Sequence, residues 1–486
     1  MKGQADIGIA GLAVMGANLA LNFESKGYTV ALYNRTTGKL DEFMDRVGSD
    51  KNFHTTGSIP EFLGFLKSPR KILMMIRAGS SVDEFIQSLR PHLRPGDILI
   101  DAGNSFFKDT IRRSQELESI GVRYVGMGVS GGEEGALNGP SLMLGCDKTA
   151  WNDLQEMLCS ISAKADAPCC ARVGANGAGH FVKMIHNGIE YAEMQMIAES
   201  YAYMRDLLHL TPDEMSDVFR HWNQTDELNS YLTGITAEIL KKKDSVTGRY
   251  LVDIILDSAG QKGTGKWTSE AAFELSVPAP TIAESVFARI ISNLKEERMA
   301  AFEVLPSVPP VRPPSPVLRE EIRTLMRAFM AAKVCVLAQG FSLITAASKE
   351  YGWKIQPQMV ARIWQGGCIL RSAILEKVAE AYETNPKLDN LLLDPYFKNI
   401  IASTNFDWRD TVAKAVRSGI ALPAFSSTVA YYDAIRTARL PANIIQALRD
   451  YFGAHMFERI DEPRGHFFHA DWYDSSTKIT STDYNV

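Results

Sequence analysis

Short apolar runs alternate with helical patterns over the first third of the chain. The predicted strands are ADIGIA, YTVALY, KILMMI, DILID, VRYVGM and SLMLG, with a further short strand at PCCARVG. Helical patterns lie between most of these runs, and this alternation is typical of a doubly wound parallel sheet with helices on both faces. We therefore predict a Rossmann-like α/β domain over residues 1–178.

Long helical periodicities replace this alternation after about Gly179. The segment TPDEM predicts a helix start, with Thr211 as N-cap and Glu214 completing a capping box. The most apolar stretch, AFMAAKVCVLAQGFSLITAA, carries Lys333 and Gln339, so a buried core helix is favoured over a membrane span. An all-helical domain is predicted over residues 179–437.

Two segments interrupt or follow the helical region. LPSVPPVRPPSP, from Leu305 to Pro316, reads as an extended loop because of its proline content. Residues 438–486 are rich in aromatic, histidine and charged side chains. They predict a short helix followed by a tail that must lie on another surface.

A faint internal repeat links two parts of the helical region. WNQTDELNSYL from Trp222 and WQGGCILRSAI from Trp364 share four positions at an offset of 142 residues. The same offset pairs Lys183 with Leu325, so only the first copy would keep polar residues there. A duplication and a chance similarity between amphipathic helices are both open at this point.

Length, charge and cysteine content exclude several classes of protein. A chain of 486 residues is expected to form two or three domains. A net charge of −5 does not provide the excess positive charge that is typical of proteins that bind nucleic acid or an anionic membrane. The chain has six cysteines, of which Cys169 and Cys170 are adjacent and the others are scattered. Without metal-ligand spacing they indicate reduced thiols in a cytoplasmic protein, with no metal and no disulfide framework. MKGQADIGIAG enters a strand directly, so no signal peptide is expected.

A glycine fingerprint follows the first predicted strand. Gly11, Ala13 and Gly16 stand between that strand and a helix, in the context that a dinucleotide-binding turn requires. The helix N-terminus would then face the pyrophosphate. The second strand ends in Asn34, Arg35 and Thr36 rather than in a carboxylate, which favours NADP over NAD.

Five polar residues share one stripe of the helix in GHFVKMIHNGIEY: Lys183, His186, Asn187, Glu190 and Tyr191. Such spacing normally carries core-facing apolar residues. A lysine shielded from water has a lowered pKa and can act as a base, and a carboxyl two turns away could address another carbon of the same ligand. The stripe therefore predicts a reaction centre.

Further candidates lie in loops and in later helices. Asn104 in DAGNS and Ser130, Gly131 and Gly132 in GVSGGEEGA follow predicted strands, where α/β sheets bind ligands. The neighbouring carboxylates of GVSGGEEGA diverge on any regular element, so they are not expected to form one site. A substrate phosphate would need cations and hydroxyls, and the candidates are Lys262, Thr264, Arg289, Arg449 and His455.

Over essentially its whole length the chain resembles the 6-phosphogluconate dehydrogenase family. The motifs that carry the resemblance are GLAVMGANLALN, YNRT, DAGNS, GVSGGEEGA, GAGHFVKMIHNGIEY, SAGQKGTGKWT, FARIISNLKEER and IIQALRDYFGAH. The resemblance implies NADP as cofactor, 6-phosphogluconate as substrate, and a homodimer whose tail, residues 438–486, reaches the partner subunit. Substrate binding and dimerisation would belong to residues 179–437.

The resemblance also implies residue roles. NADP would be held by Gly11, Leu12, Ala13, Val14, Met15, Gly16, Asn34, Arg35, Thr36, Ile76, Arg77, Ala78 and Asn104. The substrate would be held by Asn104, Ser130, Gly131, Gly132, His186, Asn187, Tyr191, Lys262, Thr264, Arg289, Arg449 and His455. Lys183 would be the base for oxidation, and Glu190 would protonate the product of decarboxylation.

Two alternatives share part of these features. Shorter β-hydroxyacid dehydrogenases resemble the first two-thirds of the chain but lack the second helical copy and the tail. A non-catalytic NADP-binding protein would have lost Lys183 or Glu190, and both are present.

Overall fold

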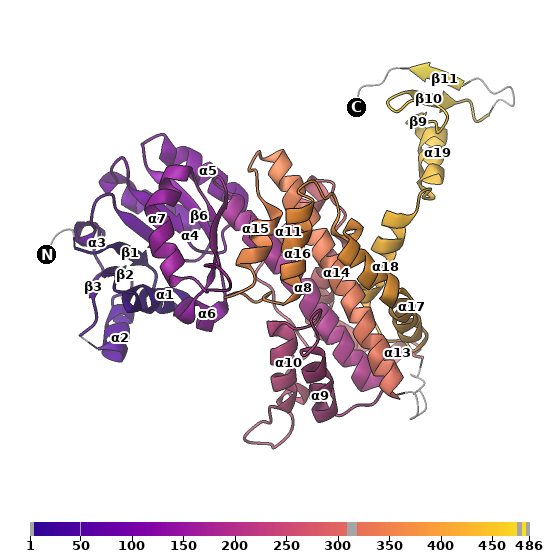
Figure 1. Ribbon diagram of the computed structural model, residues 1–486, viewed down its shortest axis with the longest axis horizontal. Coiled ribbons are helices and arrows are strands. Elements are labelled where there is room, and N and C mark those ends of the chain that lie inside the picture. The colour runs from indigo at the N-terminus through magenta and orange to yellow at the C-terminus, as the bar shows by residue number, and fades with distance from the viewer. Residues whose placement is uncertain (1–3, 49, 309–317, 474–478, 483–486) are drawn as a thin grey trace. The chain divides into compact units, whose positions relative to one another are not determined.

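The structure is a computed structural model that describes residues 4–48, 50–308, 318–473 and 479–482. The chain divides into two compact units, Met1–Val429 and Ala430–Val486, which are described separately. The first unit contains a sheet with helices on both faces, followed by a long series of helices (Figure 1). This arrangement confirms the predicted fold class.

One sheet organises the N-terminal part of the first unit. Its spatial order is β3-β2-β1-β4-β5-β6-β7-β8. Pairing is parallel throughout except between β6 and β7, which are antiparallel. The strands are β1 (Ile7–Ala10), β2 (Val30–Tyr33), β3 (Phe53–Thr56), β4 (Lys71–Met74), β5 (Ile98–Asp101), β6 (Arg123–Ser130), β7 (Ser141–Gly145) and β8 (Cys170–Gly174).

Alternation along the strands supplies two hydrophobic cores, one on each face of the sheet. On β5, Ile98 and Ile100 join the core with α1, α2 and α7, whereas Leu99 joins the core with α3, α4 and α5. Full burial of both faces explains why these strands read as continuous apolar runs. The helices are α1 (Val14–Ser25), α2 (Gly38–Val47), α3 (Ile59–Phe65), α4 (Ser80–Leu89), α5 (Phe107–Glu118), α6 (Gly132–Asn138) and α7 (Lys148–Ile161).

Two features of the sheet differ from the sequence-based expectation. The β6–β7 pair is antiparallel because only the short helix α6 separates the strands, and a parallel crossover needs a dozen or more residues. The strand β3, with the sequence FHTT, was not predicted. It is an edge strand with one buried residue, so its sequence has no apolar run.

The helical region begins with α8 (Ala178–Ala202) and contains a second long helix, α14 (Leu318–Glu350). Thr211 forms the predicted capping box with Glu214. The remaining helices are α9 (Pro212–Trp222), α10 (Tyr231–Lys241), α11 (Thr264–Glu274), α12 (Pro280–Asn293), α13 (Lys295–Val304), α15 (Pro357–Ile363), α16 (Ile374–Thr384), α17 (Pro395–Arg417) and α18 (Pro423–Arg436).

Helix α14 is long and apolar enough to cross a membrane by composition alone, but 83% of its most apolar window is buried inside the protein. It packs against α8 and α17. Its one strongly buried cation, Lys333, forms an ion pair of 3.0 Å with Glu193 of α8. The helix is therefore a core helix, as the sequence indicated.

The helix boundaries support the internal duplication. α10 and α16 begin at Tyr231 and Ile374, and α12 and α18 begin at Pro280 and Pro423, an offset of 143 in both pairs. α8 and α14 begin at residues 178 and 318, an offset of 140. The helix starts thus repeat at offsets close to the 142 residues of the sequence motif.

Two capping contacts also repeat between the copies. Glu199 of α8 accepts hydrogen bonds from the amides of Ala424 and Phe425, at 2.8 and 3.0 Å, where α18 begins. Gln339 of α14 accepts from the amide of Thr281, at 3.1 Å, where α12 begins. Glu199 and Gln339 are 140 residues apart, so each long helix caps a helix of the other copy.

The second unit contains α19 (Ala442–Gly453) and an antiparallel sheet of order β11-β10-β9. Its strands are β9 (Phe457–Glu458), β10 (Phe467–Ala470) and β11 (Ile479–Thr482). Asp450 is buried and accepts from the amide of Met456 at 2.9 Å and from the indole of Trp472 at 2.9 Å. The sequence predicted the helix but not this sheet. Most of the predicted proline-rich loop, residues 309–316, lies outside the described residues.

Candidate active site

The turn between β1 and α1 has the geometry of a phosphate cradle. Gly11 adopts a φ of 98°, a conformation that L side chains rarely take, and a Cβ there would collide with the Met75 carbonyl. Ala13 is the N-cap of α1 and makes no side-chain capping bond, so the first amides of the helix keep their donors for a ligand. These observations fit a bound pyrophosphate.

A cleft of about 430 Å³ lies beside this turn. Gly11, Asn34, Arg35 and Thr36 line it, and the side chains of Arg35 and Thr36 are exposed. The Asn34 side chain accepts from the amide of Leu12 at 3.2 Å, which ties the end of β2 to the glycine turn. The sequence interpretation missed a second cation here, Lys39, which lies in the first turn of α2.

A second cleft, of about 640 Å³, continues along the carboxyl ends of the strands. Ile76 and Arg77 line both clefts, and Ala78 and Asn104 line the second. Lys262, from the loop before α11, also reaches it. A ligand that spans both clefts would therefore run from the Arg35 end of the sheet toward the helical region.

The polar stripe of α8 forms one connected cluster with the end of β6. The Lys183 ammonium donates to the side chain of Asn187 at 2.5 Å and to the Ser130 hydroxyl at 3.3 Å. His186 lies 3.2 Å from that hydroxyl through Nε2 and 3.6 Å from the Glu190 carboxylate through Nδ1. Four of the five stripe residues, Lys183, His186, Asn187 and Glu190, are thus neighbours of one another rather than separate polar residues in a core.

Burial controls the protonation of this cluster. Lys183 is 7% exposed, and its burial lowers the pKa of the amine, although the Glu190 charge raises it in part. Burial also raises the pKa of Glu190, against the effect of Lys183 and Arg289. The pKa of His186 is lowered well below its ordinary value by burial and by Lys183, so its imidazole is neutral. The pKa values of Lys183 and Glu190 are therefore closer together than those of a free lysine and a free glutamate.

Hydroxyl and cationic groups lie at the far end of the stripe. The Asn187 amide donates to the hydroxyl of Thr264, at 3.1 Å, in the first turn of α11. The Arg289 guanidinium carbon stacks 3.6 Å from the centre of the Tyr191 ring. The Tyr191 hydroxyl accepts from the amide of Lys262 at 3.4 Å. This end of the cluster is suited to an anion.

The remaining predicted residues fall into three groups. Gly131 is the N-cap of α6 with a φ of 132°, and Gly132 opens that helix. The adjacent carboxylates Glu133 and Glu134 are exposed in the first turn. Arg449 and His455 are exposed in the second unit, on α19 and just after it. The first unit therefore does not contain Arg449 or His455.

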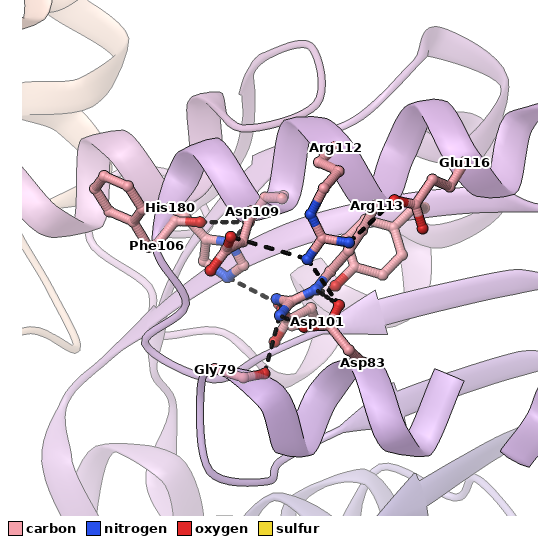
Figure 2. Close-up of polar contacts among 11 residues, drawn as sticks. Gly79, Asp83, Asp101, Phe106, Asp109, Arg112, Arg113, Glu116 and His180 are labelled. Carbon is pink, nitrogen blue, oxygen red and sulfur yellow. Dashed lines mark hydrogen bonds and ion pairs between the residues drawn. The ribbon is translucent and has the colours of Figure 1, made fainter. Parts of the chain in front are cut away.

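A buried network under the site was missed by the sequence interpretation. His180, Asp101 and Arg113 come from α8, β5 and α5, and each is at most 2% exposed (Figure 2). His180 precedes Lys183 by three residues and extends the same stripe, which was the one signal available in the sequence. The placement of Asp101 and Arg113 beside it could not be assigned without the fold.

Together, a glycine turn with donors for a pyrophosphate, a cleft along the strand ends and a buried lysine beside a carboxyl define an NAD(P)-dependent dehydrogenase of hydroxy acids. Residues 6–174 match the family profile of the NAD binding domain of 6-phosphogluconate dehydrogenase, and residues 179–472 match that of its C-terminal domain. The chain belongs to the 6-phosphogluconate dehydrogenase family.

Individual relatives agree over nearly the full length. The NADP(+)-dependent, decarboxylating 6-phosphogluconate dehydrogenase of Bacillus subtilis is 53% identical over 96% of this chain and 98% of its own. The decarboxylating enzyme of Escherichia coli is 50% identical over 96% and 99%. The solved structure of Plasmodium falciparum 6-phosphogluconate dehydrogenase, described with NADP+ and 6-phosphogluconate, gives a TM-score of 0.92 at 41% identity and covers 96% of this chain and 100% of its own.

Proposed function

We propose that this chain catalyses the NADP-dependent oxidative decarboxylation of 6-phosphogluconate to ribulose 5-phosphate and CO2. The observation that carries the proposal is the buried Lys183, bonded to Ser130 and Asn187 and placed two turns from Glu190. A simple NADP-binding protein has no need of a desolvated amine two helical turns from a partly buried carboxyl. A β-hydroxyacid dehydrogenase without decarboxylation is the alternative, and it leaves Glu190 without a task.

NADP fits the two clefts. Arg35, Thr36 and Asn34 would hold the adenosine 2′-phosphate, with Lys39 as a further cation, and the amides of residues 11–16 would hold the pyrophosphate. Ile76, Arg77, Ala78 and Asn104 would line the nicotinamide end. When bound, NADP supplies the acceptor for the hydride that leaves the substrate.

The sugar acid would lie along the polar stripe of α8. Ser130, Gly131, Gly132, Asn104, His186 and Asn187 would hold its carboxylate and hydroxyl groups. Its phosphate would meet the groups at the far end of the stripe: Tyr191, Lys262, Thr264 and Arg289. Arg449 and His455 of the partner subunit would complete this pocket.

Lys183 would act as the general base of the oxidation. Its lowered pKa lets it start neutral, so that it can take the proton of the C3 hydroxyl while the hydride leaves C3. The product is a 3-keto acid, whose ketone accepts the electron pair released when CO2 leaves. Lys183, now charged, stabilises the negative charge that develops on that oxygen.

Glu190 would act as the acid of the final step. Its raised pKa keeps a proton available on a carboxyl that is otherwise ionised in water. Protonation of the enediol at C1 gives ribulose 5-phosphate. The separation of the two groups by two helical turns matches their tasks on two carbons of one chain.

The active protein would be a homodimer with exchanged tails. Helix α12 exposes Phe287 and Ile291 at 56% and 55%, and α19 exposes Ile445 and Phe452 at 60% and 72%. Exposed apolar patches of this kind mark interfaces. We assign residues 1–178 to NADP binding, 179–437 to substrate binding and dimerisation, and 438–486 to the exchanged tail. All six cysteines are free thiols, which supports a cytoplasmic location.

A coupled assay tests the proposed function. Purified protein, 6-phosphogluconate and NADP should yield NADPH and CO2 in equal amounts. NADPH without CO2 would instead identify a simple hydroxyacid dehydrogenase. Tight NADP binding without turnover would identify a non-catalytic binding protein.

A further inference from the structure

A buried ionic network connects the loops that line the second cleft with the helix that carries Lys183 (Figure 2). At its centre is Arg113 of α5, which is 1% exposed. Its guanidinium donates to both oxygens of Asp83, at 2.8 and 2.9 Å, and to the carbonyl of Gly79 at 2.9 Å. Gly79 is the N-cap of α4 and directly follows the cleft residues 76–78.

The same guanidinium reaches the second loop through Asp101. Its Nη1 lies 3.6 Å from the carboxylate of Asp101, the last residue of β5, which is fully buried. That carboxylate accepts from the amide of Gly103 at 3.2 Å and from the Tyr124 hydroxyl at 2.9 Å. Gly103 and Asn104 line the cleft. Arg113 is therefore hydrogen-bonded to the first cleft loop and joined to the second through its ion pair with Asp101.

His180 extends the network to the reaction centre. Its Nε2 faces the carbonyl of Asp101 at 3.1 Å, and its Nδ1 lies 2.7 Å from the Thr110 hydroxyl. Since a carbonyl can only accept, Nε2 carries the proton, and burial keeps the imidazole neutral by lowering its pKa. Thr110 therefore donates to Nδ1. His180 stands one turn before Lys183 on α8.

Stability alone is a weak reason for such a network. Removing charges from water costs several kcal/mol per ion, and well-packed apolar residues of similar volume often stabilise a fold as well or better. The network is instead distinguished by the parts of the protein that it connects. Its members bind backbone atoms of the two cleft loops, namely the carbonyls of Gly79 and Asp101 and the amide of Gly103. The side chain of His180 joins them to the active helix.

We propose that Arg113 is a positioning residue for hydride transfer. By holding Asp83, Gly79 and Asp101, it sets the loops that receive the nicotinamide end of NADP against the helix turn of Lys183. The inference rests on the function proposed above and adds a residue that touches neither substrate nor cofactor. A displacement of about 1 Å between reacting groups can slow a reaction about 100-fold, so this alignment matters for the rate.

The test uses the full-length protein with Arg113→Met, and Arg112→Met as the matched control. Arg112 is the neighbouring residue and also bonds Asp83, at 2.8 Å, but it is exposed and contacts neither Gly79 nor Asp101 in this network. Arg113→Met should lower kcat roughly 10- to 100-fold with a smaller change in KM for either ligand. Arg112→Met should resemble the wild type.

The deciding readout is the kinetic isotope effect with 6-phosphogluconate deuterated at C3. Hydride transfer should become more rate-limiting in Arg113→Met, so the isotope effect on kcat should rise toward its full value. A merely structural residue would lower the amount of active protein without changing the isotope effect. A wild-type isotope effect in a folded Arg113→Met protein would overturn the inference.

Two further variants keep the test decisive if Arg113→Met does not fold, since it leaves Asp101 buried without its cation. The double variant Arg113→Met/Asp101→Asn removes both charges and should recover thermal stability but not the rate of hydride transfer. Asp83→Asn should fold, because Asp83 is partly exposed, and should raise the isotope effect in the same direction. Wild-type isotope effects in these variants would again overturn the inference. Failure of the proposed function would show separately, as a wild-type protein without turnover.

Discussion

At the scale of single residues, the chemistry depends on which charged groups are removed from water. Lys183, His186 and Glu190 occupy one stripe of α8. Burial lowers the pKa of Lys183 and of His186 and raises the pKa of Glu190, so it favours the neutral form of each. Arg35, in contrast, stays exposed at the mouth of its cleft, as a group that must meet a phosphate from solution. The buried residues carry the chemistry, and the exposed residue selects the cofactor.

Replacing Arg35 by aspartate should change the cofactor preference. A guanidinium–phosphate hydrogen bond contributes about 1.5–3 kcal/mol, so Arg35→Asp should raise the KM for NADP roughly 10- to 100-fold. The KM for NAD, which has no 2′-phosphate, should change much less. Steady-state kinetics with both cofactors measure this, and an unchanged ratio of the two constants would refute the role of Arg35.

The pH dependence of kcat should report Lys183 and Glu190 as a pair. Oxidation needs a neutral lysine, which is lost as pH falls, and the last step needs a protonated carboxyl, which is lost as pH rises. The profile should therefore be bell-shaped, with both limbs belonging to the coupled pair. In Glu190→Gln the lysine titrates alone, so activity should be lower and should only rise with pH. A bell-shaped pH profile of kcat in Glu190→Gln would show that another group is the acid.

The residues of the α8 stripe could be found in the sequence because they share one helix and its period. The network of Arg113, Asp101 and His180 could not, because its members lie on three elements that only the fold brings together. Each of them read as an ordinary polar residue of an amphipathic segment.

At the scale of elements, each of the two repeats in the helical region supplies a side chain that caps a helix of the other repeat. Glu199 caps α18, and Gln339 caps α12, so the junctions depend on buried acceptors rather than on local caps. Helix boundaries at Thr211 were predictable because the capping box is local in sequence. The long-range caps were not, since acceptor and amide are 225 and 58 residues apart.

Removing the cap at Glu199 should destabilise the first unit. Glu199→Ala leaves the amides of Ala424 and Phe425 without their acceptor and should lower the free energy of unfolding by about 1–3 kcal/mol. Gln195→Ala is the control, since Gln195 only donates to Glu199 at 3.0 Å. Thermal unfolding of both variants measures the difference. Equal stability of Glu199→Ala and the wild type would exclude a capping role.

The strands show the limit of local patterns. The buried strands were recognised by their apolar runs, but β3 was not, because its edge position needs no such run. The direction of β7 depends on the length of α6 rather than on the composition of the strand itself.

At the scale of the whole molecule, the substrate pocket is proposed to need two chains. The sequence indicated this only through the family resemblance. No pattern in a single chain shows whether its tail completes its own site or the site of the partner subunit. The charged and aromatic composition of residues 438–486 predicted only that the tail lies on another surface.

Mixed dimers test the exchange of tails. Lys183→Met and Arg449→Ala proteins should each be inactive or nearly so as homodimers. Co-expressed with different tags, they should recover about a quarter of wild-type activity, since half of the dimers are mixed and one of two sites in each is intact. If each chain used its own tail, the mixed dimer would have no intact site and activity would not recover.

The proposed role of Lys183 is tested most directly by the rate of NADPH formation in a single turnover of Lys183→Met with saturating 6-phosphogluconate and NADP. We expect wild-type dissociation constants for both ligands and a rate lower by roughly 100- to 10,000-fold, because the base that accepts the C3 hydroxyl proton is gone. A rate within a few-fold of the wild type, with both ligands bound, would contradict the assignment of Lys183 as that base.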